Sequence, residues 1–153
     1  MSNVIHYHAP SDHDFMNMAL DEARLALPVD VPVGAILVKD GKVIAQNHNQ
    51  RERDYNPVGH AEILVLQAAG EKLGDWRLNG CTLYVTLEPC PMCASAIVQS
   101  RVSRVVFGAY DPVAGACGSK HGLLMPSSSV TITGGLMEDA CQQELKGFFA
   151  QKR

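Results

Sequence analysis

The chain has 153 residues and a formal net charge of −3 at pH 7, with 46% hydrophobic and 19% charged residues. This length predicts a single domain over residues 1–153 that buries a sizeable core, and the composition is that of an ordinary globular protein. The acidic balance argues mildly against tight, non-specific binding to nucleic acid, although it leaves room for a local basic patch.

The sequence gives no sign of export or of membrane insertion. No apolar run approaches the length of a membrane span, and the first ten residues, MSNVIHYHAP, lack the basic start and apolar stretch of a signal peptide. The five cysteines are an odd number, which favours free thiols in a reducing compartment over a disulfide framework. We therefore expect a cytoplasmic protein.

The first predicted helix follows Ser11, because Asp14 lies three residues further on in the spacing of a capping box. Apolar residues then recur at helical spacing as far as Leu27, and Pro28 ends the helix.

The rest of the chain alternates between strand-like and helical stretches. Asp40-Gly41 is typical of a tight hairpin turn, Pro91 suits the first turn of a helix, and Gly74 suits a helix end. The elements that we expect are strands over 33–39 and 42–48, a helix over 60–72, a strand over 81–86, a helix over 91–100, strands over 104–108 and 130–133, and a helix over 137–151.

This order, α-β-β-α-β-α-β-β-α, combines one hairpin with strand–helix crossovers. It predicts an α/β fold of three layers, α-β-α, in which a five-stranded mixed sheet lies between helices on both faces.

Three short segments carry the chemistry: His60-Ala61-Glu62, Pro89-Cys90, and Cys93 in the run PCPMC. One imidazole and two thiolates suit Zn²⁺ and leave its fourth tetrahedral position open for a water. Bound zinc lowers the pKa of such a water to roughly 7, which makes hydroxide available at neutral pH. Glu62 is a hard carboxylate beside soft ligands, so we expect it to move protons. The combined pattern H-x-E…P-C-x-x-C is the general signature of zinc nucleobase deaminases.

Each part of this pattern has a simpler interpretation when it is taken alone. His-x-Glu at a helix start is common, and Cys-x-x-Cys also occurs in zinc knuckles, in redox pairs and by chance. The other cysteines, Cys81, Cys117 and Cys141, are isolated, which weakens the knuckle interpretation. Cys81 and Cys141 lie in apolar patterns and are expected in the core.

The predicted elements place the three possible zinc ligands at the starts of two helices. His60 opens one predicted helix, while Cys90 and Cys93 open the next. We therefore expect two helix N-termini to converge on one metal, where their partial positive charge favours thiolates and hydroxide.

At this point the chain resembles a known family. The runs HAEILVLQAAG, TLYVTLEPCPMCASAIVQSRVSRVVFGAYD and GACGS are similar to the bacterial tRNA-specific adenosine deaminases, within the cytidine deaminase superfamily. The narrower likeness depends on VPVGAILV, on Asn49 and Asn56-Pro57, and on FGAYDPVAGACGS.

The resemblance implies a cytidine deaminase-like fold, a homodimer, one Zn²⁺ per chain, and a tRNA anticodon stem-loop as partner. Its implied reaction converts adenosine to inosine at the wobble position, with attack by zinc-bound hydroxide on C6 and with Glu62 as the proton shuttle.

The resemblance also implies substrate contacts. Asn49 would hydrogen-bond the flipped base, Val31 and Pro32 would line its pocket, and Ala61 and Asp111 would lie against the nucleotide. Two of these residues have equally simple structural interpretations, since Asn49 follows a strand in a loop and Asp111 precedes Pro112 in a turn.

Other residues are weaker candidates. Phe148 and Phe149 suit a helix face packed on the core, or in part a stacking surface for RNA. Tyr110 occupies a position where the family can carry a basic residue. The candidate phosphate contacts, each more simply a solvated surface charge, are Arg51, Arg53, Arg101, Arg104, Lys120, Lys146, Lys152 and Arg153.

Two other functions remain open from the sequence. The run PCPMC also occurs in free-base enzymes of the superfamily, notably guanine deaminase. The alternative enzyme is therefore a small-molecule deaminase acting on guanine, cytosine or a nucleoside, which would keep the zinc and make RNA irrelevant. A regulatory RNA-binding module with a vestigial metal site is the non-enzymatic alternative, and Glu62 argues against it.

Overall fold

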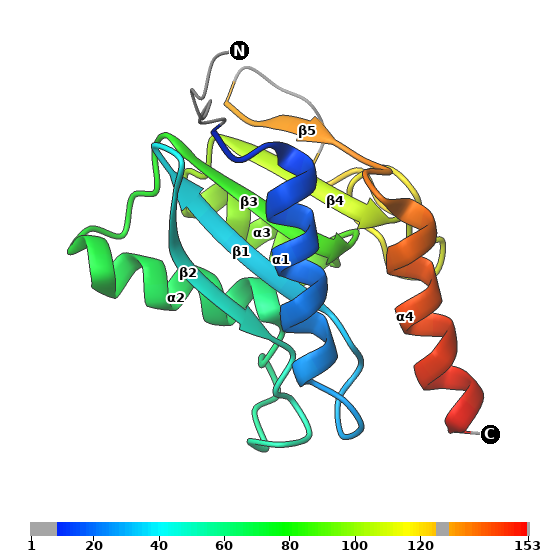
Figure 1. Cartoon of the computed structure of the whole chain (residues 1–153). Helices are drawn as coiled ribbons and strands as arrows, with labels where there is room; N and C mark the ends of the chain where they lie inside the picture. The colour runs from blue at the N-terminus through cyan, green and yellow to red at the C-terminus, as the bar shows by residue number, and fades with distance from the viewer. Residues whose placement is uncertain (1–8, 125–128, 153) are drawn as a thin grey trace, which may run out of the picture.

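Five strands form one mixed sheet that separates two pairs of helices (Figure 1). The computed structural model describes residues 9–124 and 129–152. The N-terminal segment 1–8, in which we expect no signal peptide, and the candidate phosphate contact Arg153 lie outside the described residues.

The α/β prediction and the order of elements are confirmed, and each boundary differs from its prediction by at most two residues. In chain order the elements are α1 (Asp12–Leu25), β1 (Gly34–Lys39), β2 (Lys42–His48), α2 (Ala61–Leu73), β3 (Cys81–Leu87), α3 (Pro91–Gln99), β4 (Arg104–Ala109), β5 (Thr131–Thr133) and α4 (Glu138–Gln151).

Local signals explain several of these boundaries. Ser11 and Asp14 form the predicted capping box, in which the hydroxyl of Ser11 accepts from the N–H of Asp14 and the carboxylate of Asp14 accepts from the N–H of Ser11. Asp40 and Gly41 both have positive φ, as a type I′ hairpin turn between β1 and β2 requires.

The strands lie in the order β2-β1-β3-β4-β5. β1 is antiparallel to both of its neighbours, whereas β3, β4 and β5 run parallel to one another. Consequently β2, β3, β4 and β5 all point the same way, and the segments that follow them emerge at one edge of the sheet. In open α/β sheets this edge, at the carboxyl ends of the strands, is where ligands bind.

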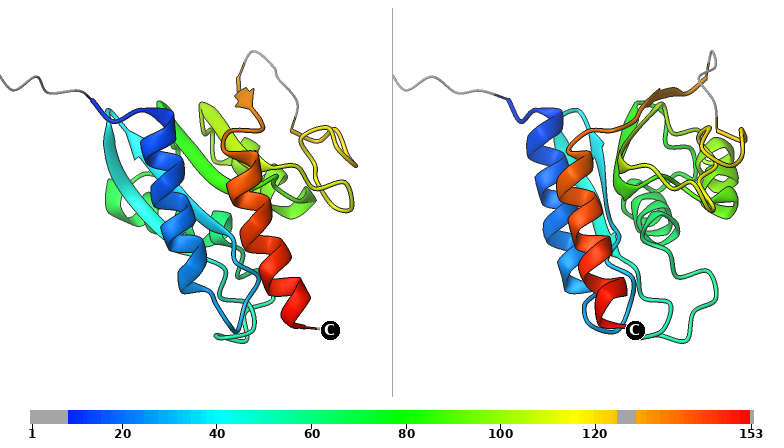
Figure 2. Two further views of the ribbon diagram at one scale, coloured as in Figure 1. Left: turned by 45° about the vertical axis from the view of Figure 1, so that its right-hand side comes forward. Right: turned by 90° about the vertical axis from the view of Figure 1, so that its right-hand side faces the viewer.

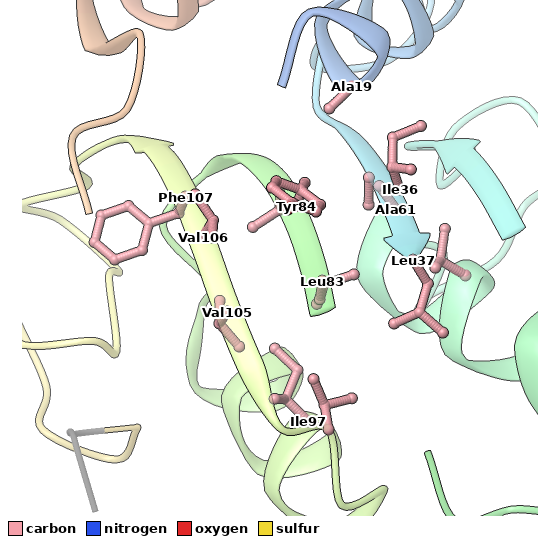
Figure 3. Packing of buried hydrophobic residues seen from close by; sticks show 14 of the residues in the cluster. Ala19, Ile36, Leu37, Ala61, Leu83, Tyr84, Ile97, Val105, Val106 and Phe107 are labelled. Carbon is pink, nitrogen blue, oxygen red and sulfur yellow. The ribbon is translucent and has the colours of Figure 1, made fainter. Parts of the chain in front are cut away.

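Helices α1 and α4 cover one face of the sheet, and α2 and α3 cover the other (Figure 2). The central strands β1 and β3 are mainly apolar, as strands that are covered on both faces usually are. Ile36, Leu83 and Val105 contribute to a core that Ala19 of α1 and Ile97 of α3 close from opposite sides (Figure 3).

Among the described residues, no helix combines the length and the apolar character that a transmembrane span needs.

Candidate metal centre

Three soft ligand atoms converge at the carboxyl edge of the sheet. The sulfur atoms of Cys90 and Cys93 lie 3.5 and 3.4 Å from Nδ1 of His60. All three ligand atoms are within 4.8 Å of one another, and within 9–124 and 129–152 they form the one such group of three or more possible ligands. The residues that the sequence motif joins are therefore neighbours in space.

These distances fit a tetrahedral zinc ion. Zinc bonds of about 2.3 Å to sulfur and about 2.0–2.1 Å to nitrogen, at tetrahedral angles, separate sulfur and nitrogen ligands by about 3.6 Å. The spacing that the protein provides is within about 0.2 Å of that value. The donor set of one imidazole and two thiols also has the softness that zinc accepts.

The ligands lie at the starts of two helices, as predicted. His60 is the N-cap of α2 and Cys90 is the N-cap of α3, and Cys93 lies in the first turn of α3. Neither N-cap side chain is used to cap its own helix, so both remain turned to the cluster. The positive ends of two helix dipoles favour anions at this point.

Electrostatics within the cluster favour a thiolate. The hydrogen bond from the Cys93 thiol, together with His60, lowers the pKa of Cys90 to about 4 despite its burial. The same bond to Cys90, together with burial, raises the pKa of Cys93. The bond to Cys90 likewise raises the pKa of His60.

Glu62 lies in the first turn of α2 and is only 4% exposed. Burial raises the pKa of its carboxyl group, so the environment favours a bound proton more than water does. A carboxyl that is buried beside thiols, and that lies outside the ligand cluster, is suited to accepting and returning protons.

The structure places the predicted substrate contacts in different settings. Oδ1 of Asn49 accepts a hydrogen bond of 2.8 Å from the N–H of Ala61, and it thereby fixes the start of the helix that carries Glu62. The Ala61 side chain is in the core, and Pro32 is also buried. Val31 is half-buried at the rim of a cavity. Contact of these four residues with substrate stays a prediction.

Asp111 serves the turn that it begins. Its Oδ1 accepts hydrogen bonds from the N–H groups of Val113 and Ala114, at 3.0 and 3.1 Å. The structural interpretation of this residue therefore has direct support, and its contact with a nucleotide stays a prediction.

Two cavities adjoin each other near the cluster, and one of them is lined by His60. One, of about 900 Å³, includes Asn49, Arg51 and His60 in its lining. The other, of about 800 Å³, runs between the loop after β4 and helix α4 and is mainly apolar. Both are lined by Val31 and by Phe149, a side chain that is 53% exposed.

The weaker candidates divide in the same way. Phe148 is buried, which fits packing on the core. The adjacent Phe149 is exposed and lines the cavities, which fits a stacking surface. Lys152 lines the larger cavity, whereas Arg104 is paired with Asp12. Cys81 and Cys141 are buried in the core as expected.

Sequence reasoning missed two buried carboxylates that hold the walls of these cavities. Asp30 is 3% exposed and accepts hydrogen bonds of 2.8 and 3.1 Å from the N–H groups of Glu52 and Arg53. Glu88 is 2% exposed and is bound by the loop after β4. The signal for Glu88 was its place directly after an apolar strand, where a charge needs partners.

Comparisons with known proteins agree with this geometry. Residues 9–109 match the family model of the cytidine and deoxycytidylate deaminase zinc-binding region. The tRNA-specific adenosine deaminase of Bacillus subtilis (strain 168) is 46% identical over 146 residues, which span 93% of this chain and 91% of that protein.

Solved structures of both enzyme alternatives resemble this chain. A structure from a study of A-to-I editing by tRNA:A34 deaminases at the wobble position matches with a TM-score of 0.81 and 44% identity, over 86% of this chain and 98% of that one. Guanine deaminase from Nitrosomonas europaea matches with a TM-score of 0.80 over 98% of both chains, but at 25% identity. Guanine deaminase from Bacillus subtilis is 36% identical, but the match has a TM-score of 0.61 and covers only 63% of this chain and 62% of that one. The backbone is therefore common to both groups, and sequence identity favours the first.

Proposed function

The chain belongs to the zinc-dependent cytidine and deoxycytidylate deaminase family, and from this premise we propose that it is a tRNA adenosine deaminase. Its reaction is the hydrolysis of adenosine to inosine and ammonia at the wobble position of a tRNA. The observation that carries the deaminase chemistry is the cluster of His60, Cys90 and Cys93, with the buried carboxyl of Glu62 beside it. The identity of 46% to a tRNA-specific adenosine deaminase supports tRNA as the substrate.

We propose that His60, Cys90 and Cys93 hold the zinc ion and that Glu62 is the catalytic acid and base. Zinc bound there lowers the pKa of a water to roughly 7 and thus supplies hydroxide at neutral pH. The Glu62 carboxylate would accept one proton of the attacking water and deliver it to N1 of the adenine ring as the C6–O bond forms. It would then carry the proton of the new C6 hydroxyl to the C6 amino group, so that the C6–N bond breaks and ammonia leaves.

The two adjoining cavities, which Val31 and Phe149 both line, form the mouth of the site. The other residues at this mouth orient the base. Asn49 holds the start of α2 through Ala61 and so fixes the position of Glu62. We propose that its free amide edge also binds the base, that Val31 and Pro32 pack against the base, and that Asp111 lies against the nucleotide.

The shape of the mouth supports an RNA substrate over a free base. A free-base enzyme must close over its ligand to exclude water, whereas an RNA enzyme must leave room for flanking nucleotides. The two adjoining cavities provide that room, with Phe149 between them and with Arg51 and Lys152 in the lining. Unpaired loop bases are recognised by stacking on aromatic side chains, which contributes about 1–3 kcal/mol per base.

We further propose that residues 1–153 form one deaminase domain that assembles as a homodimer in the cytoplasm. A groove between α2 and α3 is lined by Ile63, Leu66 and Ala96 and exposes 56% of Trp76. Exposed apolar surface with a polar rim is typical of an interface. Equilibrium sedimentation tests the dimer, which Trp76→Glu should weaken.

The proposed compartment has separate support. The five cysteines are unpaired, as is usual in a reducing compartment.

A panel of substrates tests the reaction itself. The zinc-loaded protein is incubated separately with tRNA, adenosine, guanine and cytidine, and ammonia and inosine are measured. We expect inosine in the tRNA and little turnover of the free compounds. Rapid release of ammonia from guanine, with no inosine in any tRNA, would reassign the protein to the guanine deaminases.

A further inference from the structure

Glu88 is a buried carboxylate to which neither the metal cluster nor proton transfer gives a role. It lies between the end of β3 and the Cys90 ligand. Among the described residues, all the donors to its carboxylate lie in the segment after β4. Oε1 accepts from the N–H of Asp111 at 3.0 Å and from the hydroxyl of Ser119, and Oε2 accepts from the N–H groups of Cys117 and Ser119 at 3.0 and 3.2 Å.

The chain between residues 109 and 119 is wrapped closely around this carboxylate. A Cβ atom on Gly115 would overlap the Glu88 carboxyl group, so only glycine fits there. Two backbone bonds of 2.8 Å fasten the same segments, from the N–H of Glu88 to the carbonyl of Ala109 and from the N–H of Ala116 to the carbonyl of Pro89. The carboxylate therefore replaces, for this loop, the hydrogen bonds that regular secondary structure would supply.

The loop that Glu88 holds forms a wall of the mouth. Tyr110, Asp111, Pro112 and Val113 line the apolar cavity opposite helix α4. Hydrogen bonds to a charged acceptor are stronger than neutral ones, so one buried carboxylate can fix several backbone groups at once. The position of the wall thus depends on a side chain that lies outside both cavities.

We propose that Glu88 is a positioning residue for the RNA substrate: its carboxylate holds the 109–119 loop in the conformation that receives the nucleotides next to the reacting adenosine. Glu88 acts through the loop and contacts neither substrate nor metal. The expected change in KM rests on the proposed function, whereas the expected change in hydrogen exchange of the loop does not.

Glu88→Gln is the direct test, because it keeps the shape and replaces one acceptor oxygen with an NH₂ group that faces N–H donors. We expect KM for an anticodon stem-loop to rise by about tenfold or more, with a smaller change in kcat and one zinc retained per chain. Amide hydrogen exchange should accelerate at Asp111, Cys117 and Ser119 and stay unchanged in β1.

Ser119→Ala removes only the hydroxyl bond and leaves the carboxylate intact, so it stays informative if Glu88→Gln does not fold. It should shift KM and loop exchange in the same direction by a smaller factor. Its matched control is Ser103→Ala, which also removes one side-chain hydrogen bond, the one that the Ser103 hydroxyl accepts from the N–H of Gly80, far from the loop. In the double variant Glu88→Gln/Ser119→Ala the second change should add little, because both act on one contact.

Two results would overturn the proposal. One is a Glu88→Gln protein with wild-type KM and wild-type exchange in the loop. The other is loss of zinc and of kcat with loop exchange unchanged, which would mean that Glu88 acts through the neighbouring Cys90. The exchange measurement needs no RNA, so failure of the tRNA assignment would appear separately, as a wild-type protein without activity on any stem-loop.

Discussion

At the scale of single residues, the central feature is that Glu62 and the cluster of His60, Cys90 and Cys93 have different roles. Three residues offer soft ligand atoms to one point, and the carboxyl of Glu62 is buried next to them without joining the cluster. Because burial raises its pKa, this carboxyl holds a proton more readily than an exposed glutamate does. This property suits a group that accepts and returns protons during deamination.

Replacing Glu62 separates proton transfer from metal binding. We expect Glu62→Ala to keep the fold and one zinc ion per chain while turnover of a stem-loop falls by at least about 10²–10⁴-fold. Metal analysis and inosine formation on the same sample are the measurements. Loss of zinc, or turnover near that of the wild type, would show that Glu62 has a different role.

Replacing Cys90 tests the ligand set. Cys90→Ala should lose zinc, and its melting temperature should fall, because the free energy of metal binding is partly folding free energy. Cys81→Ala is the control, since Cys81 is a buried thiol outside the cluster and its variant should keep full zinc. Full zinc occupancy in Cys90→Ala would contradict the assignment.

The cluster of possible ligands could be predicted from sequence, but the residues that hold the surrounding loops could not. His60, Cys90 and Cys93 are recognisable because ligand type and spacing follow directly from zinc chemistry. Asp30 and Glu88 are bound by backbone N–H groups of distant loops, and backbone groups carry no sequence signal. A buried carboxylate next to an apolar strand shows that partners are needed without showing which ones.

At the scale of elements, the starts of α2 and α3 and the loops in front of them build the site. Boundaries were predictable where a local signal exists, as at the Ser11 capping box and at Pro91. The pairing of strands was not, because it depends on contacts between residues that are distant in the chain. β5 is only three residues long, from Thr131 to Thr133, and its place beside β4 comes from the sheet as a whole.

The loop after β2 depends on Asp30 in the way that the loop after β4 depends on Glu88. Asp30→Ala should lower the free energy of unfolding by about 1–3 kcal/mol, because two backbone N–H groups lose a charged acceptor. Hydrogen exchange at Glu52 and Arg53 should accelerate. Asp54→Ala, at an exposed position in the same loop, should change neither quantity, and equal effects of the two variants would refute this role.

Helix α1 is tied to the sheet through Asp12, which accepts two hydrogen bonds from Arg104 and one from Tyr84. The bond from Arg104 is the main reason that the pKa of Asp12 lies below its usual value of 3.8. A lowered folded-state pKa adds stability that is fully present above the unfolded-state pKa. This stability is lost as pH falls through the folded-state pKa.

Asp12→Asn should therefore destabilise the protein at neutral pH more than at acid pH. We expect a loss of about 1 kcal/mol at pH 7, a modest value because the pair is partly exposed and screened by water. Urea unfolding at several pH values measures it, and the difference from wild type should shrink as pH falls below 3.8. Asp21→Asn, at an exposed ion pair, should show little effect, and a constant Asp12→Asn deficit at all pH values would argue against the ion pair.

At the scale of the whole molecule, strand direction explains why the functional segments meet. β2, β3 and β4 point the same way, so the loop before His60, the Glu88–Cys90 segment and the loop after β4 gather at one edge. The α/β class and its three layers could be predicted from the order of elements. The shape of the mouth could not be predicted in this way, because Phe149, near the end of α4, also lines it.

The choice between RNA and a free base also belongs to this scale, since both enzyme groups share the backbone. Identity of 46% to a tRNA-specific adenosine deaminase over 93% of the chain exceeds the identity to guanine deaminases, which is 25% over 98% of the chain or 36% over 63% of it. This difference agrees with a mouth that extends past the metal cluster into a second cavity. A net charge of −3 means that affinity for RNA depends on contacts in this mouth more than on the overall charge.

The position of the adenine within an RNA hairpin tests this account most directly. The zinc-loaded protein is given two anticodon stem-loops that differ only in whether the adenine lies at the wobble position of the loop or is base-paired in the stem, and inosine is measured. We predict inosine from the first and none from the second, because only an unpaired base can enter the site beside Glu62. Equal conversion of the two hairpins, or no inosine from either while guanine is deaminated, would contradict the account.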